Sequence, residues 1–289
     1  MANAIALFKK YIDALDEVYK LESTTSDLES NAALTRAGAV ANEILIPKYQ
    51  LQGLADYDRN NGYVRGSIVL DYETVKYNFD RGRSFLVDAM DNEETAGIAF
   101  GSLAAEFLRT QVIPEMDAFR YASYAAKAGT IATPATIADG AALLTALLDA
   151  TKILDEAEVP ATERYLKITP TLLNAVMALD TTKSREVLNT FVKVTKVPQV
   201  RFYTAIDQLD GVTEGEEAGG FIKNAAGKDI NFMIIHKPAL LQFTKHTVTK
   251  VTRPEDNKDA DAWQFNYRSY GLADVYVSKV KGIYLHNKA

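Results

Sequence analysis

The chain has 289 residues, and 32 basic against 38 acidic side chains give it a formal net charge of −6. This length predicts two or more sub-domains, because single hydrophobic cores stop growing at roughly 250–300 residues. The acidic balance argues against a dedicated nucleic-acid binder. The absence of cysteine excludes disulfides and thiol nucleophiles. No apolar run approaches the roughly 20 residues that span a bilayer, and the N-terminus lacks a secretion signal, so we expect a cytoplasmic protein without membrane contact.

Residues 1–22 have the pattern of an amphipathic helix. Apolar side chains, among them Phe8, Ile12 and Leu15, fall on one face, and charged side chains occupy the other. The polar run at residues 23–31 then breaks the helical pattern. A terminal helix before a polar hinge is typical of an arm that docks on a neighbouring subunit, although packing on its own subunit stays open as an alternative.

Residues 49–87 have the alternating pattern of a long hairpin. The sequence NNG at residues 60–62 predicts a tight turn, because its positions need positive φ. Tyr77 and Phe79 alternate with polar residues, and residues 80–83 predict a second turn before a returning strand. The hairpin is expected to have little apolar mass of its own. Such a hairpin is stable only when something packs on it, often another subunit.

The stretch at residues 88–129 predicts one long helix. Asp91 is the expected N-cap, Glu94 completes a capping box, and apolar side chains then recur at the helical period. Pro114 should kink or interrupt the helix, because it removes one main-chain hydrogen bond. At 1.5 Å per residue, about 35 residues reach roughly 50 Å. That length favours a spine along an extended subunit over a helix of a compact domain.

The second half of the chain alternates helices with strands. Asp139 predicts one helix start, and Thr169-Pro170 predicts another with proline at the first helical position. The acidic, glycine-rich residues 211–229 are expected to form a mobile surface loop. Strands are expected at residues 164–169, 200–206, 230–236 and along 263–286.

No motif carries catalytic or ligand-binding chemistry. Residues 220–228 superficially resemble a phosphate loop, but their glycine spacing is wrong and Asp229 stands where a magnesium-binding hydroxyl is needed. Residues 257–268 lack the glycine and the glutamate of a calcium loop. The 3 histidines fit no metal-binding pattern, and no GxSxG sequence anchors a catalytic serine. We therefore expect no enzyme, no cofactor and no metal.

This order of segments resembles tailed-phage major capsid proteins, which have the Hong Kong 97-type capsid fold. The resemblance rests most on VIPEMDAFRYASYAAKAG at residues 112–129, ITPTLLNAVMAL at 168–179 and GIY at 282–284. It implies an α+β subunit with a spine helix. Its expected parts are an N-terminal arm at residues 1–46, an extended E-loop hairpin at 47–90, a peripheral domain with the spine helix at 91–132, an axial domain at 133–230, and closing strands of the peripheral domain at 231–289.

The resemblance also implies a function. The chain would assemble with itself into hexamers and pentamers of an icosahedral phage head that encloses double-stranded DNA, which it would contact weakly and without sequence specificity. A separate scaffolding protein and a portal would assist assembly in the host bacterial cytoplasm, and the chain would end in the virion. The predicted intersubunit contacts are Phe8, Ile12, Leu15, Tyr63, Tyr77 and Phe79.

Other functions stay open beside this one. An encapsulin-like compartment shares the fold and would enclose cargo protein instead of DNA. A phage tail or adaptor protein would form rings or tubes. An enzyme with an unrecognised site would turn over a substrate as a monomer.

Overall fold

The computed structural model describes residues 23–30, 36–37, 42–94, 105–179 and 181–289. The predicted terminal helix, with Phe8, Ile12 and Leu15, lies outside these residues, and so does the stretch 95–104 of the predicted spine. The elements are a mixture of helices and strands, in line with the predicted α+β class.

The elements follow in chain order. The strands are β1 (Arg36–Ala37), β2 (Glu43–Leu51), β3 (Ile68–Lys76), β4 (Phe79–Asp88), β5 (Thr130–Ile131), β6 (Arg164–Ile168), β7 (Lys193–Lys196), β8 (Ile206–Gln208), β9 (Phe221–Lys223), β10 (Ile230–His236), β11 (Leu240–Thr252), β12 (Ala262–Val275) and β13 (Ile283–Asn287). The α-helices are α2 (Ala89–Glu94), α4 (Ile113–Ala126), α5 (Gly140–Glu156), α6 (Pro170–Met177) and α7 (Thr182–Asn189).

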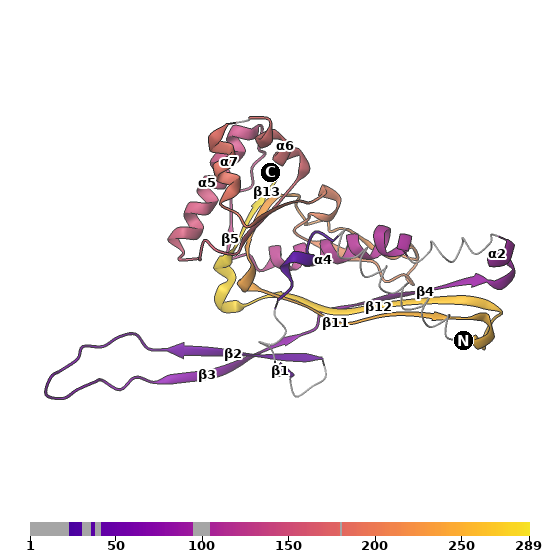
Figure 1. Ribbon diagram of the computed structural model, residues 1–289, viewed down its shortest axis with the longest axis horizontal. Coiled ribbons are helices and arrows are strands. Elements are labelled where there is room, and N and C mark those ends of the chain that lie inside the picture. Colours follow the sequence, from indigo (N-terminus) through magenta and orange to yellow (C-terminus); the bar gives the residue numbers. More distant parts are fainter. Residues whose placement is uncertain (1–22, 31–35, 38–41, 95–104, 180) are drawn as a thin grey trace.

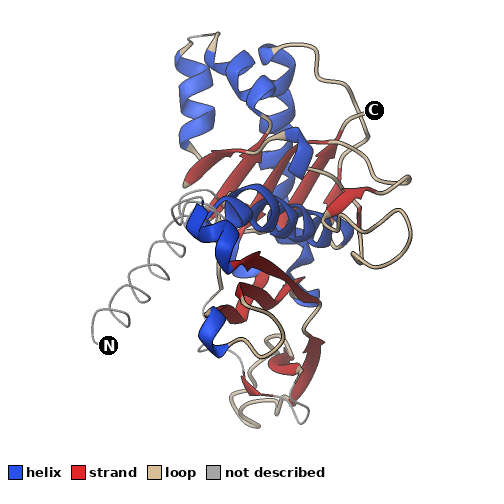
Figure 2. Cartoon of the chain, turned by 90° about the vertical axis from the view of Figure 1, so that its right-hand side faces the viewer, coloured by secondary structure: helices blue, strands red, loops and turns tan. Residues whose placement is uncertain are grey.

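A sheet in the order β5-β13-β10-β6-β7 forms the centre of the upper body (Figure 1). Figure 2 shows it between a helical layer above and α4 below. Successive residues of a strand point to opposite faces. Phe232 and Ile234 of β10 therefore share a core with α5, α6 and α7, whereas Met233 and Ile235 share one with Tyr121 of α4. Every residue of β10 is buried, because both faces of the sheet are covered, and its prediction as a buried strand is confirmed.

This sheet joins parts of the chain that the sequence analysis assigned to different domains. β10 pairs with β6 on one side and with β13 on the other. The expected division between residues 230 and 231 therefore crosses a continuous sheet. The two parts share main-chain hydrogen bonds as well as side-chain packing.

A second, elongated sheet in the order β11-β12-β4 lies below α4 (Figure 1). The turn predicted at residues 80–83 is wrong, because these residues lie inside β4 and pair with β12. The turn was predicted because Gly82 and its polar neighbours have the composition of a turn. A Cβ at this position would lie 2.6 Å from the Tyr267 carbonyl oxygen, so the glycine permits close strand pairing and not a turn.

Pro114 does not break its helix. Residues 105–126 are helical throughout, and a π-helical turn at Leu108–Val112 precedes the proline. The Ile113 N–H donates to the Leu108 carbonyl five residues back, as in a π-helix. Since proline has no N–H to offer, this wider turn absorbs the lost hydrogen bond. The predicted interruption is a change of helical register.

The start of the predicted spine is also displaced. α2 begins at Ala89, and the Asp88 carboxylate accepts a hydrogen bond from the Met90 N–H at 2.9 Å. Asp91 lies inside the helix, so its prediction as the N-cap is wrong. The neighbouring Asp88 was available for this role by the same side-chain chemistry.

Two other helix starts are confirmed. The Asp139 carboxylate accepts a hydrogen bond from the Ala142 N–H at 2.8 Å, and α6 starts with Thr169 as its N-cap before Pro170. The strand predicted at residues 164–169 is β6.

The strand predicted at residues 200–206 is wrong for most of its length. Its start lies in a 3-10 turn, Gln199–Arg201, and β8 begins only at Ile206. Phe202, which follows the 3-10 turn, packs in the core. Phe202 is fully buried, with its ring edge-on to Tyr121 at a centroid distance of 4.9 Å.

Candidate intersubunit surfaces

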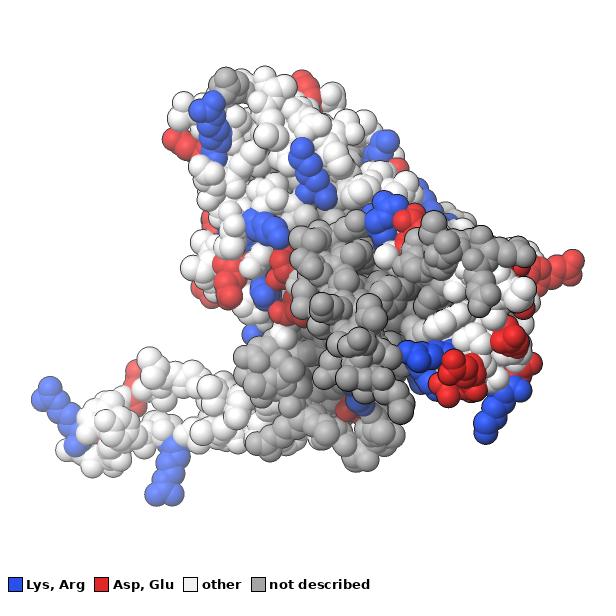
Figure 3. All heavy atoms as spheres, turned by 45° about the vertical axis from the view of Figure 1, so that its right-hand side comes forward, with Lys and Arg blue, Asp and Glu red and all other residues white. Residues whose placement is uncertain are grey.

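The hairpin of β2 and β3 projects from the body, as Figure 1 shows. Figure 3 shows it as a largely uncharged extension with a few basic and acidic side chains. Leu54 is fully exposed and Tyr63 is 87% exposed. The expectation of little apolar mass is therefore wrong. The large apolar side chains that the hairpin exposes are Tyr49, Leu51, Leu54, Tyr57, Tyr63, Val64, Ile68, Val69, Leu70 and Tyr72.

The tip of the hairpin has a defined local geometry. The Asp58 carboxylate accepts a hydrogen bond from the Asn60 N–H at 2.6 Å, and Asp58 forms a β-bridge with Gly62. The bond from Asn60 is the largest cause of a lowered pKa at Asp58. A turn forms where it was predicted, but the predicted positive φ holds only at Gly62, with 78°, and is wrong for Asn60 and Asn61. The rings of Tyr57 and Tyr63 pack together at a centroid distance of 4.8 Å.

Only the base of the hairpin packs on its own chain among the described residues. Asn78 fixes its direction, because its side-chain amide donates to the Ala273 carbonyl at 2.9 Å and accepts from the Ala273 N–H at 3.0 Å. This pair imitates a step of a β-ladder. The buried cluster at the base consists of Ile44, Ile46, Val75, Leu241, Phe243 and Leu272.

The predicted hairpin contacts differ in their availability to a neighbour. Tyr63 is open to solvent. Tyr77 is half-buried against Tyr270, with Lys245 Nζ 4.7 Å above its ring, and burial raises the pKa of Tyr77. Phe79 is 6% exposed and packs 5.1 Å from the Phe119 ring. It is a core residue of its own chain, so the expectation that it contacts a neighbour is corrected.

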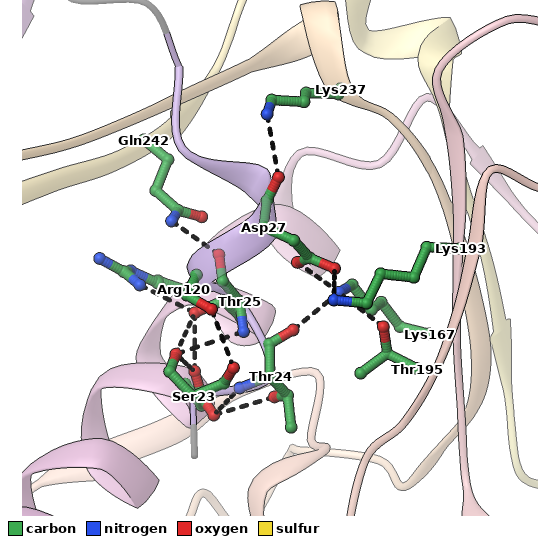
Figure 4. Close-up of polar contacts among 12 residues, drawn as sticks. Ser23, Thr24, Thr25, Asp27, Arg120, Lys167, Lys193, Thr195, Lys237 and Gln242 are labelled. Carbon is green, nitrogen blue, oxygen red and sulfur yellow. Dashed lines mark hydrogen bonds and ion pairs between the residues drawn. The ribbon is translucent and has the colours of Figure 1, made fainter. Parts of the chain in front are cut away.

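A polar segment that precedes the hairpin is buried between α4 and the central sheet. We call residues 23–28 the strap (Figure 4). Asp117 of α4 has no exposed surface. Its carboxylate accepts hydrogen bonds from the Thr24 N–H at 2.9 Å and from the Thr25 hydroxyl at 2.6 Å. Leu28 is fully buried in the core between α4 and the sheet.

Lys167 of β6 places a positive charge under the same strap (Figure 4). Its buried ammonium group donates to the Thr24 carbonyl at 2.7 Å, to the Asp27 carboxylate at 2.7 Å and to the Thr195 hydroxyl at 3.1 Å. Lys193 Nζ lies 3.1 Å from the second Asp27 oxygen. Burial lowers the pKa of Lys167, and the charge of Asp27 opposes that shift.

The strap is the part of the molecule that sequence reasoning missed. The prediction of a polar hinge at residues 23–31 is wrong for the strap, because hydrogen bonds fix these residues to α4 and β6. A signal was present in the run STTSD, since short hydroxyl and carboxylate side chains bond readily to nearby polar groups, and in Leu28 as a single apolar residue. The identity of the partners was not visible, because they are distant in sequence.

A groove of about 670 Å³ lies between β4, the helix around Glu106–Val112 and the loop at residues 209–220. Aromatic side chains, including Phe85 and Phe107, line it together with Arg81 and Arg83. The groove therefore combines apolar and charged side chains in its lining.

The loop at residues 209–220 is hydrogen-bonded to β4 at both of its ends. Arg81 donates to the carbonyls of Leu209 at 2.7 Å and Gly220 at 3.2 Å. Inside the loop, hydrogen bonds from Thr213, first of all from its hydroxyl, lower the pKa of Asp210 to about 2.

Comparisons with known proteins identify this architecture. Neither a protein-family model nor a curated protein sequence matches the chain. The capsid of cyanophage P-SCSP1u superposes with a TM-score of 0.56 and 14% identity, over 92% of this chain and 88% of that one. The mature capsid of bacteriophage PhiM1 superposes with a TM-score of 0.56 and 13% identity, over 88% and 84%. The chain has the fold of tailed-phage major capsid proteins.

The capsid fold is not confined to phage structures. A virus-like particle from Pyrococcus furiosus superposes with a TM-score of 0.57 and 10% identity, over 97% of this chain and 99% of that one. At identities this low, the likeness establishes the fold and nothing finer. Other observations have to distinguish a phage head from a protein compartment.

A second apolar surface of the capsid fold lies on the outer side of the helical layer. α5 exposes Leu148 and Ile153, and Met177 at the end of α6 is 59% exposed. α5 and α6 belong to the upper body, whereas the hairpin projects from the lower part of the subunit (Figure 1). They form a candidate contact surface.

The remaining polar candidates are structural where the structure describes them. His236 and His286 are buried, and burial lowers the pKa of both. Among the described residues, no cluster of histidine and acidic side chains could hold a metal ion. Within the same residues, no helix has the length and apolar character to cross a bilayer.

Proposed function

We propose that this chain is the major capsid subunit of a tailed phage. It assembles with copies of itself into hexamers and pentamers of an icosahedral head around double-stranded DNA. The observation that carries the proposal is the apolar surface of the β2–β3 hairpin, which is uncovered among the described residues although it belongs to a projecting element.

The projecting hairpin is expected to need a partner for its stability. An isolated two-stranded hairpin is marginal in water, and large exposed apolar patches mark interaction sites. The described part of the chain covers the base of the hairpin and leaves its far half open. A specific interface needs about 800 Å² from each partner. A long apolar arm that lies on the next subunit contributes to such an area, and a contact repeated head to tail forms a ring when its rotation closes.

The proposal includes parts that the fold alone does not determine. Residues 1–46 act as an arm, 133–230 meet their copies around the ring axis, and the shell becomes part of the virion. The exposed apolar side chains of Leu148, Ile153 and Met177 support an axial contact, since they lie on α5 and α6, within residues 133–230. A scaffolding protein and a portal complete assembly in the host cytoplasm, and DNA is held without sequence specificity. The role is structural and not catalytic.

An encapsulin-like protein compartment is the second candidate. It is favoured by the virus-like particle from Pyrococcus furiosus, which the chain matches over nearly the full length of both. Co-purification of one cargo protein inside shells of the chain alone would favour the compartment. Dependence on a scaffolding protein for regular shells would favour the phage head.

Electron microscopy of the purified chain, with and without its genomic neighbours, tests the proposal. We expect closed shells, or aberrant shells and tubes that a scaffolding partner corrects. The double variant Leu54→Asp/Tyr63→Asp should stay folded, because both side chains are exposed, but should lose these assemblies. Leu54→Met/Tyr63→Phe retains the apolar surface and is the matched control. Small, monodisperse particles of the unmodified chain under every condition would contradict the proposal.

A further inference from the structure

The strap supplies hydrogen bonds to two buried charges that belong to different layers of the protein. Asp117 lies on α4 and receives bonds from Thr24 and Thr25, while Lys167 lies on β6 and donates to Thr24 and Asp27. Both charged residues have no exposed surface. A buried charge that loses its partners is strongly destabilising.

The socket around the strap has an excess of positive charge. Arg201 Nη1 lies 3.4 Å from Asp117, and Arg120 donates to the Thr25 hydroxyl at 2.8 Å. Lys237 donates to the main-chain carbonyl of Asp27 at 3.0 Å. The strap therefore brings its carboxylate, that of Asp27, into a socket where cations outnumber Asp117. Charge complementarity holds the segment in addition to the burial of Leu28.

The strap has little regular structure of its own. Its described element is one 3-10 turn, Ser26–Leu28, and its contacts with the body run largely through side chains. Neither the central sheet nor the β11-β12-β4 sheet includes it as a strand. Both sheets therefore retain their main-chain hydrogen bonds if the strap leaves.

We propose that the strap is a separable docking element. Residues 23–28 dock as one unit into the socket of Asp117 and Lys167, and they open without unfolding the two sheets. Docking is all-or-none, because a half-open strap leaves a buried charge without its partners, whereas full opening admits water to both. This inference concerns the single subunit and holds whatever the subunit assembles into.

Hydrogen–deuterium exchange of the full chain, followed by mass spectrometry, tests the inference. The readout compares a peptide that covers the strap with one that covers β10. In Asp117→Ala, we expect exchange of the strap peptide to rise about 100-fold, while β10 changes less than about twofold. Glu29→Ala removes an exposed carboxylate next to the strap and should leave both peptides unchanged.

A second pair of variants keeps the test decisive if Asp117→Ala does not fold. Asp27→Ala leaves Lys167 buried with fewer partners and should lower the melting temperature. Asp27→Ala/Lys167→Met removes both charges, so it should recover the melting temperature while the strap peptide still exchanges rapidly. This combination cannot arise if the strap and the sheets form one cooperative unit.

Two results would overturn the inference. If the strap and β10 exchange at one common rate in the unmodified chain and in every variant, the strap is an inseparable part of the core. If exchange of the strap peptide is unchanged in Asp117→Ala or in the double variant, the two charges do not hold it. Neither result bears on whether the chain forms shells.

Discussion

The Arg81 guanidinium donates to the Glu115 carboxylate at 2.7 Å and so ties β4 to α4. The same guanidinium donates to the carbonyls of Leu209 and Gly220, at the two ends of the loop that borders the groove. One partly buried side chain therefore joins a strand, a helix and a loop that are distant in the sequence. Charged hydrogen bonds of this kind are each worth about 1.5–3 kcal/mol.

Replacing Arg81 by alanine should loosen this junction. We expect the free energy of unfolding to fall by about 2–3 kcal/mol, since several charged hydrogen bonds disappear and Glu115 stays largely buried. Residues 209–220 should become sensitive to limited proteolysis. Urea unfolding and protease digestion of the purified chain measure both effects.

A neighbouring arginine provides the control. Arg268 forms an ion pair with Asp80 at 2.7 Å, but both side chains are well exposed. Arg268→Ala should therefore cost only about 0–1 kcal/mol. Equal losses in the two alanine variants would mean that the junction at Arg81 adds nothing to an ordinary surface pair.

The buried His286 should make stability depend on pH. Its ring stacks on Phe232 at a centroid distance of 5.0 Å and lies beside the Asn231 amide. Burial lowers the pKa of His286 below its usual 6.5, so the folded state favours the neutral ring. The unfolded chain binds the proton first as pH falls. The contribution is therefore complete above pH 6.5 and is lost as pH falls through the lowered pKa.

Urea unfolding between pH 8 and pH 5 measures this effect. The free energy of unfolding should fall below about pH 6.5, and His286→Gln should make the curve flatter over that range. His236→Gln is a second comparison, because burial lowers the pKa of His236 as well. A curve that the His286 replacement leaves unchanged would show that this ring does not contribute.

Gly140 permits close contact between α5 and α6. A Cβ on this residue would overlap the Ala175 carbonyl and lie 3.1 Å from a Leu179 methyl. Alanine is the better helix former by about 1 kcal/mol, yet Gly140→Ala should cost about 1–3 kcal/mol because the helices must move apart. Gly53→Ala is the control, since no heavy atom would lie within 4 Å of its Cβ. Thermal unfolding distinguishes the two, and a stabilised Gly140→Ala variant would contradict the packing argument.

Two leucines should respond differently to the same truncation. Leu28 of the strap is fully buried, so Leu28→Ala should cost about 2–5 kcal/mol. Leu54 at the hairpin tip is fully exposed, so Leu54→Ala should change the stability of the unassembled subunit by less than about 0.5 kcal/mol. Denaturant unfolding of unassembled protein checks both. A loss at Leu54 that matches the loss at Leu28 would show that the hairpin tip packs within its own chain.

The features predicted correctly from the sequence have their physical causes within a few residues. The Asp139 cap and the turn at residues 60–62 use main-chain groups close to the side chain that marks them. The start of α6 follows from Pro170, whose fixed φ and missing N–H suit the first helical position. Such caps and turns form in the same way wherever the segment lies. The fold class and the resemblance to capsid proteins also followed from the order of these segments.

The incorrect predictions concern residues whose partners are distant. Gly82 and its neighbours have the composition of a turn, but β12 takes them into a strand. The strap reads as a polar break, yet Thr25 donates to Asp117 across 92 residues of chain. The sequence shows which hydrogen bonds such a residue can donate or accept, but it does not show which residue will be the partner. The partner depends on how the layers pack, because a buried charge or hydroxyl must find its hydrogen bonds among whatever side chains folding brings beside it.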